Sequence, residues 1–336
     1  MRWVTWKMGK KRSSIKEYLR LGRLFNAEIL SLIFVLSYML SSKIHDVEID
    51  VRTLSSLFVA GILAHIWGAY NNDRMDLAID KDVSYCSHKP LVSGSISIEA
   101  AKRIEFFVLS IFIFLILYIS PKISTMVYLL CAVTLAYLYN RFNKSNMFIN
   151  IVGQMYAGFA VLIGMSVVVD FDFVVFLSAL VIGLNGVYLN IVEADLKDIK
   201  GDVVNVPRAL GVRFRDGKAV NIRGFYILNE GIKLCMFVLI LYILFLEKAD
   251  GMVFVLACVF FVLNFAVRCF MFLNLSSDRE RMKPYIAGQE LTSILFIGTI
   301  YMVVLPFLPI VLVFFVLIWF LLWNKFLWGT CFRPQV

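Results

Sequence analysis

The feature that constrains this chain most is a series of long apolar runs. A helix needs about 20 mostly apolar residues to cross the hydrocarbon core of a bilayer. Runs of that kind recur along almost the whole sequence, near residues 25–42, 53–70, 104–120, 124–140, 148–169, 172–192, 224–247, 251–274, 286–305 and 307–328. The last two are separated by a short segment with Pro306 and Pro309, which is either a tight turn or a kink. The sequence therefore predicts nine to ten membrane spans.

The composition agrees with a membrane protein and excludes several other classes. Of the 336 residues, 60% are hydrophobic and 17% are charged, whereas soluble domains are about 45–50% apolar and about 25% charged. Such a chain has too few polar side chains to cover a water-facing surface. A disordered chain and a soluble nucleic-acid-binding protein are therefore excluded. The expected fold is all-α: a polytopic membrane bundle of nine to ten transmembrane helices, with a central cavity open to the cytoplasmic side.

The distribution of Lys and Arg predicts the orientation of this bundle. If the N-terminus lies in the cytoplasm and the spans alternate in direction, all but five of the 33 basic residues fall at cytoplasmic ends, as the positive-inside rule requires. The exceptions are Lys43, Arg52, Lys122 and Lys248 outside and Lys233 within a span. We expect a basic cytoplasmic N-terminus at 1–23, a transmembrane domain at 24–328 and a short cytoplasmic tail at 329–336. The net charge of +9 thus reflects topology and indicates anionic lipids, not nucleic acid, as neighbours.

Acidic residues are concentrated in two windows, each directly after an apolar run. Residues 72–82 contain Asp73, Asp76, Asp80 and Asp82, and residues 193–202 contain Glu193, Asp195, Asp198 and Asp202. Both windows lie on the predicted cytoplasmic side. Two solvated acidic loops would be the simplest explanation, but they do not account for a spacing of four residues that occurs in both windows.

The spacing indicates a function for these acids. If each window continues the preceding helix, residues four apart share a face. One face then carries Asn72, Asp76 and Asp80, and the other carries Asp198 and Asp202. Carboxylates aligned in this way repel one another, and hard oxygen ligands select Mg²⁺, which proteins bind through few carboxylates together with substrate phosphates. The two windows therefore predict an Mg²⁺-dependent diphosphate site.

Basic residues near the acids fit the same interpretation. Lys89 follows Asp80 by nine residues, and Arg141 and Lys144 follow the fourth apolar run. Phosphate oxygens that no metal holds need such cations. Each of these residues taken alone is also consistent with a purely topological role.

At these residues the sequence resembles the UbiA family of intramembrane prenyltransferases. The first window matches the N-D-x-x-D-x-x-x-D motif of that family, and the second matches its D-x-x-D-x-x-x-D motif. Residues 89–94 match an R-P-L-x-S-G element, except that Lys89 stands where the family usually has Arg. Residues 20–26 resemble the basic start of the first helix. The resemblance covers about residues 15–305.

The resemblance implies transfer of a polyprenyl group from its diphosphate to a hydrophobic or amphipathic acceptor, either a lipid precursor such as geranylgeranylglyceryl phosphate or a quinone or aromatic precursor. It implies catalytic roles for Asp73, Asp76, Asp80, Asp195, Asp198 and Asp202. It places Mg²⁺ on Asn72, Asp76, Asp80, Asp198 and Asp202. It implies diphosphate contacts from Arg23, Asn26, Lys89, Tyr139, Lys144 and Lys197, with Tyr137 and Arg141 as the alternative to Tyr139 and Lys144.

Two other functions stay open from the sequence. A membrane terpene cyclase would use the same diphosphate site without an external acceptor. A transporter would also use intramembrane acids, although usually near the middle of a span. The expected partners are the prenyl donor, the acceptor and membrane lipids, with no nucleic acid and no obligate protein partner. The expected location is the cell membrane of a prokaryote, because no organelle transit peptide is recognisable.

Two further charges lie within a predicted span. Glu230 and Lys233 are three residues apart early in the seventh apolar run. They either pair with each other and extend toward the near interface, or line the acceptor pocket.

Overall fold

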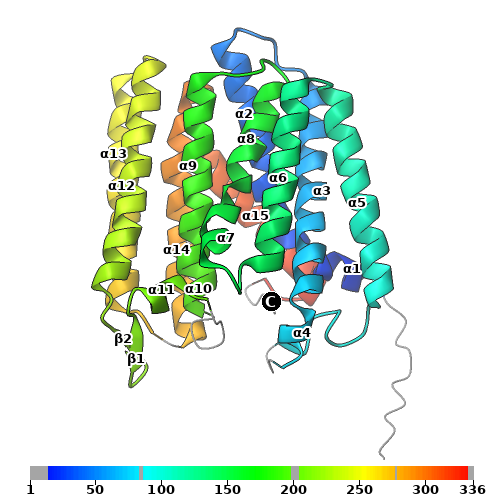
Figure 1. The fold of residues 1–336 in the computed structure, drawn as a ribbon. Coiled ribbons are helices and arrows are strands. Elements are labelled where there is room, and N and C mark those ends of the chain that lie inside the picture. Colours follow the sequence, from blue (N-terminus) through cyan, green and yellow to red (C-terminus); the bar gives the residue numbers. More distant parts are fainter. Residues whose placement is uncertain (1–13, 83–85, 198–203, 277, 332–336) are drawn as a thin grey trace, which may run out of the picture.

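The computed structural model describes residues 14–82, 86–197, 204–276 and 278–331, without the side chains of residues 193, 194, 197, 279 and 280. In this part of the chain, long helices run side by side and form one bundle (Figure 1). They are α2 (Ala27–Ile44), α3 (Val51–Met75), α5 (Ile98–Ile119), α6 (Ile123–Phe142), α7 (Met147–Val152) with α8 (Tyr156–Ser166), α9 (Phe173–Leu189), α12 (Arg223–Leu246), α13 (Gly251–Leu273), α14 (Arg279–Gly298) and α15 (Leu308–Trp328).

Nine of the helical segments in the described residues are long and apolar enough to cross a membrane. The helix α5 completes a set of ten. Its first turns carry Lys102, Arg103 and Glu105, which lower the apolar character of that end, but it runs beside α3 along the bundle (Figure 1). The segment between α14 and α15 is a break between two helices, because Pro309 occupies the first turn of α15. The chain is therefore a multi-pass membrane protein, and the prediction of nine to ten spans agrees with the structure.

Successive long helices alternate in direction, which brings the cytoplasmic signals of the sequence together. The C-terminal ends of α3 and α9 lie at one end of the bundle. The short helices α1 (Ile15–Leu21), α4 (Leu77–Asp80), α10 (Asp195–Lys197) and α11 (Val206–Ala209) lie there too (Figure 1). The end of α15 lies at the same end. Both acid windows thus share one face of the bundle.

The helices pack closely where small residues allow it. Gly61 of α3 faces the backbone of Ser31 in α2, and Gly164 of α8 faces Phe34 and Ser37, which also lie on α2. A Cβ atom at either glycine would overlap these neighbours. Such small residues let membrane helices approach each other when both are surrounded by equally apolar lipid. The three helices α2, α3 and α8 therefore form a tight group behind the first acid window.

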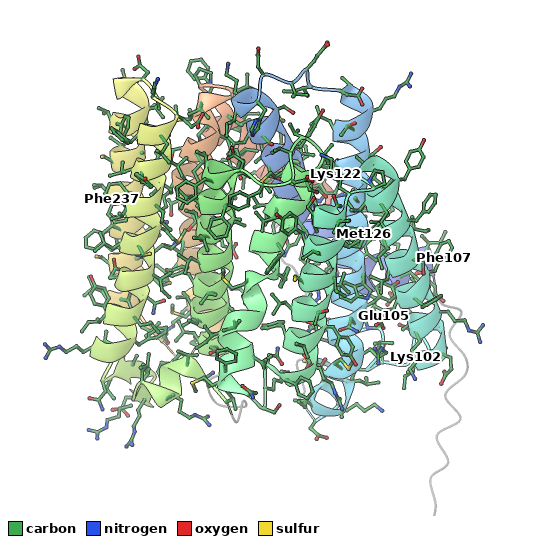
Figure 2. The ribbon with its side chains drawn as sticks, turned by 45° about the horizontal axis from the view of Figure 1, so that its top comes forward. Lys102, Glu105, Phe107, Lys122, Met126 and Phe237 are labelled. Atoms are coloured by element: carbon green, nitrogen blue, oxygen red, sulfur yellow. The ribbon has the colours of Figure 1, made fainter. Side chains whose placement is uncertain are left out.

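The outer surface of the bundle is apolar along its length. Large exposed side chains include Phe107 of α5 and Met126 of α6, and both point away from neighbouring helices in Figure 2. Lys102 and Lys122 lie near opposite ends of the same helix pair (Figure 2). On α12, Phe237 stacks on Phe261 of α13 with ring centroids 4.1 Å apart. This distribution matches a protein whose side faces lipid and whose charged residues lie at the two ends.

One small element departs from the all-α expectation. The strands β1 (Arg213–Arg215) and β2 (Lys218–Val220) pair antiparallel. Their turn is Asp216-Gly217, in which both residues have positive φ, 48° and 78°. Asp-Gly is the favoured pair for such a two-residue hairpin turn. The hairpin lies at the end of the bundle that carries the acid windows (Figure 1).

Candidate functional site

The first acid window keeps a helical hydrogen-bond pattern although α3 ends inside it. The Asp76 amide donates to the Asn72 carbonyl and the Asp80 amide donates to the Asp76 carbonyl, each at 2.9 Å. Asn72, Asp76 and Asp80 therefore lie along one face across the bend between α3 and α4. The side chains of Asp73, Asp76 and Asp80 are all buried, with 4%, 8% and 5% of their surface exposed. Burying three carboxylates requires compensating charge.

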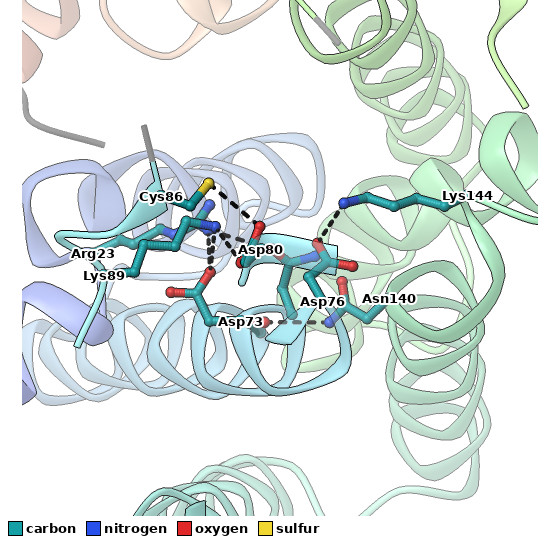
Figure 3. A network of polar contacts seen from close by, with 10 residues as sticks. Arg23, Asp73, Asp76, Asp80, Cys86, Lys89, Asn140 and Lys144 are labelled. Atoms are coloured by element: carbon teal, nitrogen blue, oxygen red, sulfur yellow. Dashed lines mark hydrogen bonds and ion pairs between the residues drawn. The ribbon is translucent and has the colours of Figure 1, made fainter. Parts of the chain in front are cut away.

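Two basic residues compensate Asp73 and Asp80 (Figure 3). Arg23 Nη2 lies 2.6 Å from Asp73 Oδ1 and 3.3 Å from Asn72 Oδ1. Lys89 Nζ lies 2.7 Å from Asp80 Oδ2 and 3.5 Å from Asp73 Oδ1. Asp73 and Asp80 thus share one ammonium group, which brings their carboxylates to the same point. These contacts join the segment before α2, the end of α3 and the loop after α4.

The third carboxylate, Asp76, has a different basic partner, Lys144. Lys144, just after α6, places its Nζ 3.3 Å from Asp76 Oδ2 (Figure 3). Burial raises the pKa of Asp76, and the attraction of Lys144 opposes that rise. We call Asp73, Asp76 and Asp80 with their partners Arg23, Lys89 and Lys144 the acid cluster.

Two basic members of the acid cluster, Arg23 and Lys89, remain charged. Attraction to Asp73 raises the pKa of Arg23 in spite of burial. Burial lowers the pKa of Lys89, but attraction to Asp73 and Asp80 outweighs it, so the net shift is upward. Arg23 also has a left-handed backbone with φ of 47°, which is uncommon for a residue other than glycine. Its carbonyl accepts a 3.1 Å hydrogen bond from His65 Nε2, which fixes this turn against α3.

A second set of polar side chains holds the end of α3 in place. Glu105 of α5 accepts hydrogen bonds from Arg74 Nε at 2.7 Å and from Asn71 Nδ2 at 2.6 Å. Asn140 of α6 donates to Asn71 Oδ1 at 2.9 Å. The helices α5 and α6 are thereby fixed to the turn of α3 that carries Asp73. The sequence interpretation did not single out these residues. The available signal was Glu105, an acid at the edge of an apolar run.

In the second acid window, the structure describes the side chain of one acid, Asp195. Both carboxylate oxygens of Asp195 lie 3.2 Å from Asn150 Nδ2, and Oδ2 also accepts from the Val206 amide at 2.9 Å. Asn205 Nδ2 donates to the Asp195 carbonyl at 2.6 Å. Asp195 thus connects α7, α10 and α11. Asp198 and Asp202 lie outside the described residues, as does the side chain of Lys197.

Tyr139 belongs to the surroundings of Asp195, not to those of Asp76. Its hydroxyl donates to Asn190 Oδ1 at 2.5 Å, and Asn190 Nδ2 donates to Asn150 Oδ1 at 2.7 Å. Lys144 reaches Asp76 from the same helix end. Tyr139 and Lys144 therefore face the two acid windows, whereas the alternative pair, Tyr137 and Arg141, is exposed. Asn26, at the end of η1 (Leu24–Asn26), is also exposed. Asn150, Asn190 and Asn205 carry no motif that would identify them from the sequence.

The acid cluster offers ligands for a hard cation but does not hold them in a ready-made cage. Among the described residues, no three His, Cys, Asp or Glu side chains converge closely enough to hold a metal ion. Instead, each carboxylate of the cluster contacts a basic side chain. Carboxylate and amide oxygens are the donors that Mg²⁺ prefers, so Asn72, Asp76 and Asp80 fit that ion by chemistry. A divalent cation would take the place of the basic partners.

A pocket opens beside the acid cluster. Its lining combines basic, acidic and aromatic side chains, namely Arg20, Arg23, Asp73, His88, Lys89, Pro90 and Trp328. Basic groups predominate over the single carboxylate. Such a lining attracts an anion and provides an apolar surface next to it.

The charges on α12 are arranged differently from the sequence prediction. Glu230 pairs with Arg268 of α13, with nitrogen-to-oxygen distances of 2.7 Å and 2.8 Å. Lys233 is fully buried and donates to Asn185 and Ser293 at 3.0 Å each, with its Nζ 4.0 Å from the ring centre of Tyr188. The predicted Glu230–Lys233 pair is wrong, because the two side chains contact different helices. We call Glu230, Lys233 and Arg268 with Asn185, Ser293 and Asn264 the α12 network.

The sequence model of the UbiA prenyltransferase family matches residues 31–287. No curated protein sequence matches the chain.

Several solved structures share the fold. A digeranylgeranylglyceryl phosphate synthase is 20% identical with a TM-score of 0.66, covering 87% of this chain and 99% of its own. A UbiA homologue from Archaeoglobus fulgidus bound to GPP and Mg²⁺ is 16% identical with a TM-score of 0.61, covering 86% and 99%. An apo UbiA homologue from Aeropyrum pernix K1 is 14% identical with a TM-score of 0.60, covering 80% and 96%.

Proposed function

The chain belongs to the UbiA prenyltransferase family, and from this premise we propose that it transfers a polyprenyl group from its diphosphate to an acceptor within the membrane. The observation that carries the proposal is the acid cluster. Three buried carboxylates at the end of α3 contact three basic side chains from three other parts of the chain. Nothing in the packing of the bundle requires so many buried charges at one point, whereas binding a metal and a diphosphate does.

The residues fit Mg²⁺ as cofactor. Asn72, Asp76 and Asp80 share one helix face, and we propose them as its ligands, together with Asp198 and Asp202 of the second window. When bound, Mg²⁺ supplies positive charge that neutralises the diphosphate and favours its departure. The choice of Mg²⁺ is supported by the homologue from Archaeoglobus fulgidus, whose structure contains Mg²⁺ and GPP.

The basic members of the cluster have a separate task in this proposal. Arg23, Lys89 and Lys144 each contact a carboxylate of the cluster. On donor binding they turn to phosphate oxygens, where hydrogen bonds to ionised groups are short and strong. They stabilise the charge that accumulates on the diphosphate as its bond to the allylic carbon breaks. The acceptor then bonds to that carbon and releases a proton to water, and diphosphate is the other product. Asp195, which Asn150, Asn205 and the Val206 amide hold in place, has a positioning role at the start of the second window.

The acceptor is the finer part of the proposal. We propose an amphipathic lipid acceptor, with geranylgeranylglyceryl phosphate as the first compound to test. The structural likeness to a digeranylgeranylglyceryl phosphate synthase supports this choice, as does the surplus of basic side chains in the pocket beside the cluster. A quinone or aromatic precursor is the second compound to test.

The orientation belongs to the proposal as well. Basic residues are concentrated at the end of the bundle that carries the acid cluster. We therefore propose that this end and the N-terminus lie in the cytoplasm of a prokaryotic cell. Cysteine-accessibility labelling of residues 43–52 from outside and of residue 82 from inside tests this assignment.

A product assay tests the function. Membranes containing the protein are incubated with a labelled polyprenyl diphosphate, Mg²⁺ and the acceptor, and the lipids are separated. We expect a labelled adduct that requires both the acceptor and Mg²⁺ and that EDTA abolishes. A labelled cyclic hydrocarbon formed without acceptor would identify a terpene cyclase instead. Absence of any labelled product with every acceptor class would contradict the proposal.

A further inference from the structure

The last long helix, α15, lies outside the part of the chain that matches the family. The match ends at residue 287, and α15 spans Leu308–Trp328. The helix packs against α14 and the 3₁₀ segment η5 (Thr299–Val303), and also against α1, η1 and α2. It therefore joins the ninth long helix to the first and closes the bundle next to the N-terminal segment.

Three hydrogen bonds fasten α15 to that segment. The Arg20 guanidinium donates to the Leu327 carbonyl, from Nε at 3.2 Å and from Nη2 at 2.5 Å. The indole nitrogen of Trp319 donates to the Leu24 carbonyl at 2.8 Å. Phe25 packs edge-on against Trp328, with ring centroids 5.1 Å apart. These contacts fix the rotation of α15 and its position along the bundle relative to Arg23, which follows Arg20 by three residues.

The fastening places one aromatic side chain in the pocket beside the acid cluster. Trp328, the last residue of α15, lines this pocket together with Arg23, Asp73 and Lys89. Its indole lies 5.9 Å from the Arg20 guanidinium. Apart from Pro90, the other lining residues are charged or polar, so the indole is the largest apolar group in the pocket lining. A rigid ring in this position limits how bulky a bound phosphate group is able to be.

We propose that Trp328 is a specificity-determining residue, which sets the size of the phosphate-bearing headgroup that the pocket admits. The ligand class is a compound with two linked phosphate or phosphonate groups, and this inference rests on the proposed function of the acid cluster as a diphosphate site. The basic residues supply the attraction, and the α15 helix supplies the steric limit. A small headgroup contacts Arg23 and Lys89, whereas a headgroup with a bulky substituent overlaps the indole.

Binding of two matched probes to the purified protein in detergent with Mg²⁺ tests the proposal. The probes are methylene bisphosphonate and its analogue with a phenyl group on the bridging carbon, which carry the same anionic groups. The ratio of the two dissociation constants is measured by calorimetry, so a general loss of affinity cancels. In the unaltered protein we expect the small probe to bind at least about tenfold more tightly, a typical discrimination by a steric contact.

The ratio of the two dissociation constants is compared among three variants and one control. Trp328→Ala should reduce the preference about tenfold, and Trp328→Phe should reduce it less. Trp319→Phe removes the indole hydrogen bond to Leu24, keeps an aromatic ring at that position and should reduce the preference roughly two- to threefold. Trp323→Ala is the matched control, since Trp323 lies on the same helix, is half-buried like Trp328 and is not among the pocket residues. The two phenylalanine variants keep a ring in place and carry the test if Trp328→Ala does not fold.

The outcomes separate this inference from the function on which it rests. A preference that survives in Trp328→Ala and Trp328→Phe, or one that falls equally in Trp323→Ala, would overturn the role of Trp328. A protein that shows the predicted ratios but forms no prenylated product would leave Trp328 as the size limit and refute the prenyl transfer. A protein that binds neither probe with Mg²⁺ would overturn both.

Discussion

Two of the buried groups of charged side chains in the bundle differ in whether a ligand is able to replace their partners. In the acid cluster, three carboxylates face three basic side chains that come from flexible lysine stems or from a turn, and a pocket adjoins them. In the α12 network, Arg268 is fully buried, contacts Glu230 through two nitrogens and also donates to Asn264. The first arrangement permits a metal or a phosphate to replace a partner. The second has no such opening among its described contacts, and its role is to hold α12 to α13.

The largest expected effect is on stability in the α12 network. Glu230→Gln leaves the Arg268 guanidinium buried without its carboxylate, and breaking a buried pair in this way costs about 3–5 kcal/mol. We expect a marked loss of thermal stability in detergent, followed by tryptophan fluorescence. The matched variant Glu230→Leu with Arg268→Leu removes both charges and should recover most of that stability. A double variant less stable than Glu230→Gln would show that the pair does more than balance its own charges.

The acid cluster should respond in the opposite way, with a large loss of activity and little loss of stability. Asp76→Asn removes one proposed Mg²⁺ ligand but keeps the shape of the side chain, and Lys144 remains free to turn to water. We expect turnover to fall more than about 100-fold, with a melting temperature close to that of the unaltered protein. The measurement is a product assay alongside thermal unfolding. Unchanged turnover would remove Asp76 from the metal site.

An intermediate effect is expected for Lys89. If Lys89 holds the diphosphate, Lys89→Gln loses a charged hydrogen bond worth about 1.5–3 kcal/mol, which is about ten- to a hundredfold in kcat/KM. Lys89→Arg should retain much of the activity. Lys102→Gln is the control, because Lys102 lies at the same end of the bundle and has no ion pair with the described acids of either window. Equal effects at the two positions would assign Lys89 to topology alone.

The smallest effect is expected for Lys233, although among the described residues it is the most deeply buried lysine. Its partners are two neutral oxygens and an aromatic ring, so Lys233→Met removes the amine without leaving another charged group unpaired. We expect the free energy of unfolding to change by less than about 1.5 kcal/mol and the product distribution to stay the same. A change in acceptor preference instead would return Lys233 to the acceptor pocket, the alternative that the sequence left open.

The sequence predicted the parts of this molecule that depend on local pattern. The apolar runs and their proline break located the long helices. Asp76 and Asp80 share one face, as their spacing predicts, because the backbone hydrogen bonds continue through the bend after α3. Local pattern does not specify which side chains meet across helices. The Glu230–Lys233 pair was therefore assigned wrongly, since sequence proximity hid the contact between Glu230 and Arg268, 38 positions later. The same holds for Asn150, whose partner Asp195 is 45 positions away.

The contact between Arg20 and Leu327 joins two residues that are 307 positions apart. Loop closure over such a distance comes late in folding, because the chain between the two ends has to be ordered first. For a chain that is synthesised and inserted from its N-terminus onward, Arg20 enters the membrane surface long before its partner exists. The pocket beside the acid cluster is therefore the last part of the molecule to be completed. A chain that stops before α15 would carry every acid of both windows and still lack one side of that pocket.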